Sequence, residues 1–284
     1  MSPPRALPSL PPVRDVIARH GLDARRSLGQ HFLLDLNLTA RVARAAGDLT
    51  GMSVIEVGPG PGGLTRALLE AGAERVVAIE KDPRSAAAMR EMAAAVSDRL
   101  QVVEADALTV DPASLAPPPR KIVANLPYNI SIPLLLLWLR NIGDYAGLTL
   151  MFQKEVADRL TANPGASAYG RLTVITQWLC TVRREFNVDR NAFTPPPRIT
   201  STVVSLIPRP EPLAPASWEA LERVTAAAFG QRRKMLRGSL RSLRLDPASA
   251  GIAPTRRAED LSVAEFCALA RALGDADAGT TSSP

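Results

Sequence analysis

Cysteine and histidine are scarce in this chain of 284 residues, which contains two of each. Cys180 and Cys267 both lie in apolar helical patterns and lack C-x-x-C spacing, which argues against a disulfide framework or a thiolate metal site. We interpret both as buried, inert thiols and expect no metal in the functional site. Whatever chemistry the protein performs must therefore depend on other side chains.

The chain also lacks a long hydrophobic run and a secretory signal. Its longest strongly apolar stretch, residues 130–139, is interrupted by Ser131 and Pro133 and is shorter than the roughly 20 residues that a membrane span needs. Residues 1–12 are rich in proline and show no basic segment followed by an apolar core, so we expect a disordered lead-in instead of a signal peptide. We expect a cytoplasmic protein with no membrane partner.

Acidic residues are outnumbered by basic ones. The chain has 34 Lys and Arg against 28 Asp and Glu, which gives a net charge of +6 and a pI near 9.9. This balance favours a polyanionic partner such as a nucleic acid. The length leaves room for one large domain and one small one.

Strand and helix patterns alternate from residue 53 onward. Such alternation predicts an α/β fold with a mostly parallel sheet, covered on both faces by helices. A closing antiparallel pair is expected at one edge. The seven predicted strands are residues 53–57, 75–79, 100–104, 121–124, 148–152, 181–188 and 202–207. In sheets of this kind, ligands bind beyond the C-terminal ends of the strands.

A proline-rich segment separates this region from a helical C-terminal part. Residues 208–215 contain four prolines and cannot continue a strand. We therefore expect a large domain over residues 1–208, a linker over 209–216 and a helical domain over 217–284. The helices expected there are residues 218–229, 232–243 and 263–273.

Three predicted strand ends carry groups that suit a nucleoside. Gly58 and Gly60 open a G-x-G-x-x-G sequence between a strand and a helix, where a ligand can approach the backbone closely. Glu80 ends the next strand, 22 positions after Gly58, where an acid commonly accepts hydrogen bonds from ribose hydroxyls. Asp106 follows the third strand and could accept one from an adenine amine. Together these residues indicate an adenosine-containing cofactor, although a tight turn alone would also explain the glycines.

The fourth strand end separates the candidate cofactors, because NAD and S-adenosylmethionine would both use the features above. Here the strand delivers Asn125 to the turn Leu126-Pro127-Tyr128, for which a nicotinamide-dependent oxidoreductase has no evident use. Asn and Pro are, however, common wherever a strand ends in a turn.

A methyltransferase that acts on adenine N6 does have a use for this turn. If the Asn125 amide oxygen and a carbonyl of Leu126 or Pro127 accept the two N6 hydrogens, the nitrogen moves towards tetrahedral geometry. Its lone pair then points at the methyl donor, and catalysis consists of positioning and electrostatics. Tyr128 would stack on an extruded adenine. The turn therefore favours S-adenosylmethionine.

Basic residues concentrate near the C-terminus. The segment between Gly230 and Leu245 contains no acid and six basic residues, namely Arg232, Arg233, Lys234, Arg237, Arg241 and Arg244. Arg233, Arg237 and Arg241 recur every four positions and would share one helix face. A solvated face is the usual role of a charge run, but the absence of acids favours contact with RNA phosphates. Arg25 and Arg26 would extend the same surface.

These stretches together resemble the bacterial small-subunit ribosomal RNA adenine dimethyltransferase (KsgA/RsmA) family along nearly the whole chain. The matching stretches are residues 29–33, 54–60, 78–82, 104–108, 125–131, 153–160, 169–172, 193–197 and 229–240. Leu28 departs from the family, which usually has Phe there, and this puts in doubt only a local packing contact.

The resemblance implies a Rossmann-like class I methyltransferase domain with a small helical C-terminal domain. It implies methyl transfer from S-adenosylmethionine to N6 of two adjacent adenosines in the 3′-terminal hairpin loop of 16S rRNA, within the immature 30S subunit. We expect a monomer. By motif position, His31 and Leu33 would line the methionine end of the cofactor, and Gly58 would lie under it. Glu80 would hold the ribose and Asp106 the adenine. Asn125 would face the methyl group, and Phe193 would be the second aromatic of the target-base pocket.

Three other interpretations remain open at this point. A large-subunit adenine methyltransferase would use the same chemistry, a nicotinamide-dependent oxidoreductase would use the same cofactor loop, and an assembly factor could do without catalysis. For His31, the alternative role is that of an ordinary packed histidine.

Overall fold

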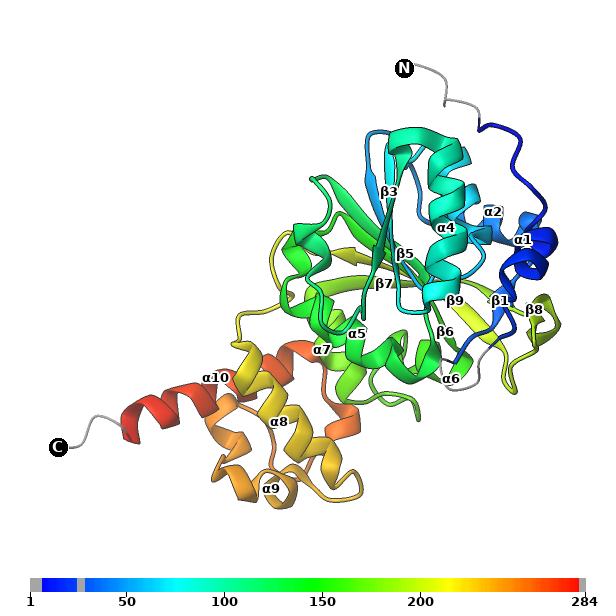
Figure 1. Cartoon of the computed structure of the whole chain (residues 1–284). Coiled ribbons are helices and arrows are strands. Elements are labelled where there is room, and N and C mark those ends of the chain that lie inside the picture. The colour runs from blue at the N-terminus through cyan, green and yellow to red at the C-terminus, as the bar shows by residue number, and fades with distance from the viewer. Residues whose placement is uncertain (1–6, 25–28, 281–284) are drawn as a thin grey trace. The chain divides into compact units, whose positions relative to one another are not determined.

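The computed structural model describes residues 7–24 and 29–280 (Figure 1). They form two compact units, the first made of Met1–Ala157 and Arg183–Pro208, the second of Asp158–Val182 and Arg209–Pro284. This division differs from the sequence-based one, which places residues 158–182 in the first domain. The reason is a helix in that segment, α7 (Arg171–Leu179), which packs against two helices that follow more than 30 residues later.

The first unit is built around a seven-stranded sheet in the order β4-β3-β2-β5-β6-β9-β7. Strands β2 to β6 run parallel, and β9 is antiparallel to β6. The strands are β2 (Ser53–Val57), β3 (Arg75–Glu80), β4 (Leu100–Glu104), β5 (Arg120–Asn125), β6 (Gly147–Gln153), β7 (Cys180–Val188) and β9 (Ser201–Pro208). The mostly parallel sheet predicted from the sequence is confirmed.

The strand order reverses between β2 and β5. From β2 the chain moves outward through β3 to β4, and it then returns to place β5 on the other side of β2. At such a switch point the connections diverge and leave a crevice beyond the strand ends. This is where the sheet can accept a ligand.

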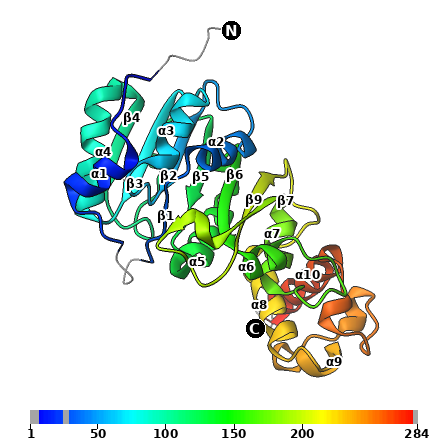
Figure 2. The ribbon, with the colours of Figure 1, turned by 90° about the vertical axis from the view of Figure 1, so that its right-hand side faces the viewer.

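Helices cover both faces of this sheet. Figures 1 and 2 show α1, α2, α3 and α4 on one face and α5 on the other. The helices are α1 (Val13–His20), α2 (Leu36–Ala45), α3 (Gly63–Glu70), α4 (Pro83–Val96), α5 (Tyr128–Arg140) and α6 (Lys154–Leu160). Between α2, α3 and the sheet lies the main core, where Leu68, Val54 and Val123 are fully buried.

Residues 7–12 are packed, in contrast to the disorder expected for residues 1–12. Leu7 and Leu10 lie against the main core, and the Arg66 guanidinium donates a hydrogen bond to the Pro11 carbonyl (2.6 Å). Burial of the two leucines explains the difference, because proline-rich composition alone does not show which apolar side chains find a partner. Residues 1–6 lie outside the described part of the chain.

A short antiparallel pair joins two segments that are far apart in sequence. Strand β1 (Phe32–Leu33) pairs with β8 (Phe193–Thr194), so that Leu33 lies opposite Phe193. The sequence predicts a loop at residues 25–35, because a strand of two residues shows no period. The pair holds residues 29–33 beside the strand ends of the main sheet.

The second unit is helical. It contains α7, α8 (Trp218–Gly230), α9 (Leu236–Ser239) and α10 (Val263–Thr280). The Phe229 ring stacks on Phe266 at 5.3 Å and meets the edge of Tyr169 at 6.0 Å. Across the unit, the indole of Trp178 donates a hydrogen bond to the Ala214 carbonyl at 2.8 Å.

The helix predicted over residues 232–243 is wrong. Only α9 and a 3-10 turn at Arg241–Leu243 are helical there. The amide of Leu236 donates to the Arg256 carbonyl and that of Arg237 to the Pro254 carbonyl, at 2.8 and 3.0 Å. Since these amides bond to another segment, they cannot continue a helix from residue 232.

Two expectations about the whole chain can be compared with the described residues. None of their helices is both long and apolar enough to cross a membrane. Cys180 and Cys267 are buried and unpaired, and burial raises the pKa of both thiols. No cluster of metal-binding side chains occurs within residues 7–24 and 29–274, whose side chains the structure describes.

Candidate functional site

A pocket opens at the switch point of the sheet. Ile55 of β2 pairs with Ile122 of β5 in a parallel register. Gly58 and Asn125 each follow three residues later, so both lie at the C-terminal edge of the sheet. Both line the pocket, together with the strand ends at Glu80 and Asp106 and with the covering segment, which we define as residues 29–32. The structure thus brings together the predicted cofactor residues Gly58, Gly60, Glu80, Asp106, Asn125 and His31.

The glycine loop needs its glycines for two reasons. Gly58 and Gly60 have φ values of +70° and +55°, in the left-handed region that favours glycine. A Cβ at Gly60 would also lie 2.9 Å from the ring of Phe32. The covering segment therefore packs directly on the loop, and a side chain at Gly60 would push it away.

Glu80 is held in place by two main-chain amides. Its Oε1 accepts a hydrogen bond from the Asp82 amide (2.8 Å) and its Oε2 accepts one from the Gly60 amide (3.2 Å). Burial raises the pKa of Glu80, and these hydrogen bonds partly oppose the rise. The carboxylate is thus fixed at the pocket wall beside the glycine loop.

Asp106 lines the pocket just beyond the end of β4, the strand next to that of Glu80. Its Oδ2 contacts Lys81 Nζ at 2.7 Å, and its Oδ1 accepts a hydrogen bond from the Leu108 amide at 3.0 Å. The Lys81 ammonium holds the pKa of Asp106 below its usual range. Asp106 therefore remains an ionised acceptor at neutral pH.

The Asn125 amide is oriented by the covering segment. Its Nδ2 donates a hydrogen bond to the His31 main-chain carbonyl at 3.1 Å. Because the nitrogen is used in this way, Oδ1 is the atom left for a ligand, and none of the described residues donates to it. Asn125 thus presents an acceptor at the pocket.

The next two residues differ in how their carbonyls are used. The Pro127 carbonyl accepts a hydrogen bond from the Ile130 amide (3.1 Å) in the first turn of α5. The Leu126 carbonyl accepts none from the residues that the structure describes, while the Leu126 side chain is buried. Of the two carbonyls proposed to act with Asn125, that of Leu126 is available.

The His31 ring contacts two aromatic rings, those of Tyr128 and Phe193. His31 stacks on Tyr128 with ring centroids 5.8 Å apart and meets the edge of Phe193 at 6.5 Å. The Tyr128 hydroxyl shares a hydrogen bond with Ser201 Oγ at 2.5 Å. His31 Nδ1 lies 2.7 Å from the Pro195 carbonyl and must carry its proton, because a carbonyl can only accept.

Two predicted site residues are placed differently from the others. The side chains of Leu33 and Phe193 are buried in the main core and are absent from the pocket lining. The Leu33 carbonyl would lie 2.8 Å from a Cβ at Gly63, so this strand supports the end of the glycine loop through its backbone. Phe193 meets the site through the His31 ring.

A second hollow adjoins the pocket and shares Gly29, Gln30, His31 and Tyr128 with it. Gln153 and the loop of residues 195–199 complete its lining. Gln153 ends β6 two residues beyond Met151, which pairs with Asn125. Gln153 is not among the residues predicted from the sequence, although its place at a strand end in the predicted sheet is a usable signal.

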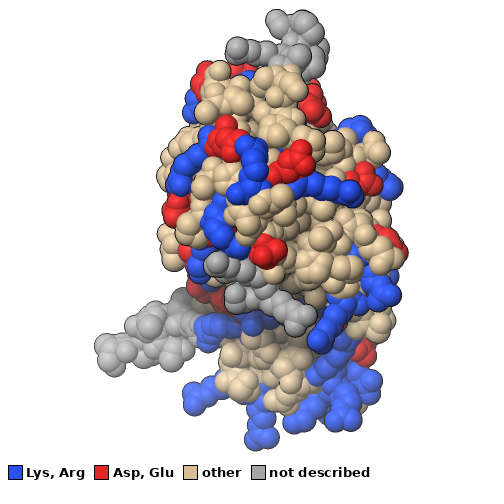
Figure 3. Space-filling model, turned by 45° about the vertical axis from the view of Figure 1, so that its right-hand side comes forward, with Lys and Arg blue, Asp and Glu red and all other residues tan. Residues whose placement is uncertain are grey.

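The basic segment of the second unit is mostly exposed. Arg233, Lys234, Arg237 and Arg241 are exposed, whereas Arg232 forms an ion pair with Glu259 at 3.0 Å. In Figure 3, Lys and Arg side chains gather on the second unit, in the lower part of the view, with few acids among them. Because the predicted helix is broken, these side chains belong to a turn, α9 and a 3-10 turn. Arg25 and Arg26 lie outside the described residues.

Comparisons with known proteins agree with this geometry. A family model described as ribosomal RNA adenine dimethylase matches residues 21–275. The chain is 68% identical over 269 residues to ribosomal RNA small subunit methyltransferase A of Paramagnetospirillum magneticum, covering 93% of this chain and 95% of that protein. For the protein of the same name from Rhodospirillum rubrum, identity is 61% over 267 residues, with 93% of each chain covered.

Two solved structures are also similar. A dimethyladenosine transferase from Plasmodium falciparum has a TM-score of 0.73 at 26% identity, covering 84% of this chain and 96% of that one. The 23S rRNA methyltransferase ErmE has a TM-score of 0.65 at 29% identity, covering 86% of this chain and 99% of that one. Both are similar to this chain in fold, the mostly parallel sheet with helices of a class I methyltransferase.

Proposed function

This chain belongs to the ribosomal RNA adenine dimethylase family, and we propose that it dimethylates N6 of two adjacent adenosines in the 3′-terminal hairpin loop of 16S rRNA. S-adenosylmethionine is the proposed methyl donor, and the immature 30S subunit in the cytoplasm is the proposed substrate for a monomeric enzyme. The names of the two relatives described above favour the small subunit over the large one and argue against an oxidoreductase.

The observation that carries this proposal is the orientation of Asn125. The His31 carbonyl accepts a hydrogen bond from the side-chain nitrogen of Asn125 at 3.1 Å, which leaves Oδ1 as an acceptor at the pocket. The Leu126 carbonyl supplies a second acceptor next to it in the chain. Two acceptors are what an amine with two hydrogens requires.

The residues of the pocket fit S-adenosylmethionine. Glu80 is suited to accept hydrogen bonds from the ribose hydroxyls, Asp106 to accept one from the adenine amine, and the loop at Gly58 to let the cofactor approach its backbone. When bound, the cofactor supplies a methyl group on a sulfonium, which already has a good leaving group. The protein therefore needs to position the target amine and needs no strong base.

The proposed role of Asn125 and Leu126 is to localise the N6 lone pair. Hydrogen bonds from both N6 hydrogens to these oxygens favour a tetrahedral nitrogen, whose lone pair is no longer delocalised into the ring. After methyl transfer, the positively charged nitrogen is strongly acidic and loses a proton to solvent. For the second methylation one hydrogen remains, and one of the two acceptors is then sufficient.

Tyr128 and the adjoining hollow suit the target base. The hydrogen bond to Ser201 fixes the Tyr128 ring, and a fixed ring offers a stacking surface with little loss of rotamer freedom. The hollow beside it is lined by Gln153 and by residues 195–199. We propose that the extruded adenine enters from this side, with the exposed basic residues of the second unit contacting RNA phosphates.

Labelled S-adenosylmethionine tests this proposal directly. The protein is incubated with 30S subunits from a strain that lacks the modification, and the methylated nucleotides are mapped by mass spectrometry of RNase fragments. The expected product is N6,N6-dimethyladenosine at two adjacent positions near the 3′ end of 16S rRNA. Labelling of 50S subunits instead, or label spread over many adenosines, would overturn it.

A further inference from the structure

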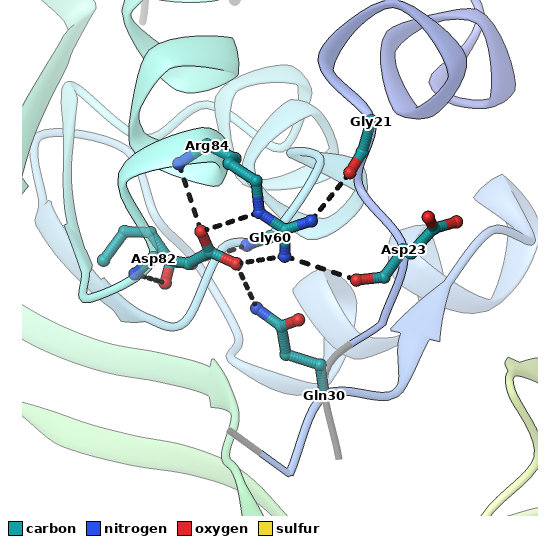
Figure 4. A network of polar contacts seen from close by, with 7 residues as sticks. Gly21, Asp23, Gln30, Gly60, Asp82 and Arg84 are labelled. Carbon is teal, nitrogen blue, oxygen red and sulfur yellow. Dashed lines mark hydrogen bonds and ion pairs between the residues drawn. The ribbon is translucent and has the colours of Figure 1, made fainter. Parts of the chain in front are cut away.

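We infer that Asp82 and Arg84 are positioning residues for the cofactor pocket: they bind the covering segment to the Glu80 carboxylate (Figure 4). The inference rests on the proposed function, because it assigns Glu80 and the covering segment to cofactor binding. Neither Asp82 nor Arg84 lines the pocket itself.

Asp82 is the centre of this network. Its side chain is fully buried, and its Oδ2 accepts hydrogen bonds from Arg84 Nη2 (2.7 Å) and from Gln30 Nε2 (3.1 Å). Its main-chain amide donates to Glu80 Oε1 at 2.8 Å. One residue therefore connects the covering segment, through Gln30, to the proposed ribose-binding carboxylate.

Arg84 extends the network to the chain that follows α1. Its Nη1 donates to the Gly21 carbonyl at 2.7 Å, and its Nη2 reaches the Asp23 carbonyl at 3.3 Å. Its Nε donates to Asp82 Oδ1 at 3.1 Å. A planar guanidinium has several N–H donors at fixed angles and can donate to all these acceptors at once, whereas a lysine ammonium cannot.

Asp82, the centre of this network, stays ionised at neutral pH. Hydrogen bonds from Arg84 hold the pKa of Asp82 at about 2, against the effect of burial. A buried carboxylate that stays ionised and has several charge-assisted partners resists displacement. Asp82 therefore offers Gln30 an ionised acceptor at neutral pH.

Loss of this anchor should change the pocket at two points. His31 follows Gln30, and its carbonyl orients Asn125; Phe32 packs on the glycine loop at Gly60. If Gln30 moves, both contacts loosen, although neither involves Asp82 directly. We therefore expect weaker cofactor binding and a more exposed covering segment.

The competing explanation is that Asp82 only caps α4. Its Oδ1 does accept a hydrogen bond from the Arg84 amide at 3.1 Å, as an N-cap residue does. The variant Asp82→Ser separates the two roles, because serine is a good N-cap but cannot hold Gln30 and the Arg84 guanidinium together. Arg84→Lys keeps the charge and leaves the cap intact, and it serves as a second variant should Asp82→Ser not fold.

Two measurements on the full chain test the inference. The first is the dissociation constant of S-adenosylmethionine by calorimetry without RNA, and the second is hydrogen exchange of residues 29–33 in the cofactor-free protein. We expect both variants to bind about ten-fold more weakly, the effect of losing one charge-assisted hydrogen bond. Exchange of residues 29–33 should be faster in both.

Arg90→Lys is the matched control. Arg90 lies on the same helix and pairs with Glu104 at 2.7 Å, but that pair is exposed and neither residue lines the pocket. Its affinity and exchange should equal those of the wild type. Affinity within two-fold of wild type in both test variants, or a loss of thermal stability with unchanged exchange at residues 29–33, would overturn the inference. Absence of binding by the wild type would instead refute the proposed function.

Discussion

The side chain of Asn125 donates its amide hydrogen to the main-chain carbonyl of His31, at 3.1 Å and across 94 positions of the sequence. An amide has one donor end and one acceptor end, so fixing the nitrogen also fixes the oxygen. The acceptor of Asn125 is thereby directed by a main-chain group of the covering segment.

Replacement of Asn125 by Ala should abolish most catalysis and leave cofactor binding largely intact. The lost acceptor acts on the target amine, and loss of a comparable oriented group typically lowers kcat by roughly 100-fold or more. Single-turnover rates on 30S subunits and calorimetric titration of the cofactor measure the two effects. Asn141→Ala, which removes an exposed amide just after α5 and outside the pocket lining, is the control. Turnover near wild type in Asn125→Ala would contradict the mechanism.

Replacement of Gly60 by Ala should weaken cofactor binding more than its backbone strain explains. The new Cβ would meet the Phe32 ring at 2.9 Å and displace the covering segment. Gly51→Ala is a close control, since Gly51 has a φ of +69° but no atom within 4 Å of a Cβ. We expect both variants to lose a similar stability, about 1 kcal/mol, and only Gly60→Ala to lose affinity. Equal affinities for S-adenosylmethionine would refute the packing argument.

Replacement of Arg233, Arg237 and Arg241 by Gln should weaken binding to immature 30S subunits and flatten its salt dependence. Each phosphate contact releases condensed counterions, so loss of three contacts should reduce the slope of log K against log salt by about two to three. The control removes three exposed arginines of the first unit, Arg14, Arg19 and Arg90, and changes the net charge equally. If both triple variants show the same slope, the basic segment is a solvated face.

Glu56 should make the protein less stable as the pH rises. It is buried in β2, where its Oε2 accepts a hydrogen bond from the Thr65 hydroxyl, and burial raises its pKa to about 8. The pKa of Glu56 in the folded state lies above the unfolded value of 4.5. The contribution of Glu56 to the free energy of unfolding is therefore fully present below pH 4.5 and is lost as the pH rises to about 8.

Glu56→Gln should remove this dependence, because the amide stays neutral and can still accept the Thr65 hydrogen bond. Urea denaturation at pH 6 and pH 8.5 measures the effect, which we expect to be on the order of a few kcal/mol. Glu155→Gln, at an exposed position, should leave the wild-type dependence unchanged. Parallel pH profiles for wild type and Glu56→Gln would show that Glu56 is ionised in the folded protein.

Elements with strong local signals were predicted well. Residues 53–57 and 100–104 form the strands expected of them. Residues 83–96 form a helix with a clear local signal, since Asp82 is its cap and Pro83 lies in its first turn. Apolar runs, caps and glycines depend on neighbours within a few positions of the chain. For this reason the residues at four strand ends, Gly58, Glu80, Asp106 and Asn125, could be named from the sequence, and all four line the pocket.

The sequence by itself determined which groups reach the edge of the sheet, because strand ends and turns are encoded locally. Tertiary structure alone decided how they are used. The Leu236 amide donates a hydrogen bond to the Arg256 carbonyl, so the predicted helix does not form. Strand β1 pairs with the strand at Phe193, and the side-chain nitrogen of Asn125 donates to the His31 carbonyl. These outcomes depend on hydrogen bonds between segments far apart in the chain, and no pattern within one segment specifies the partner.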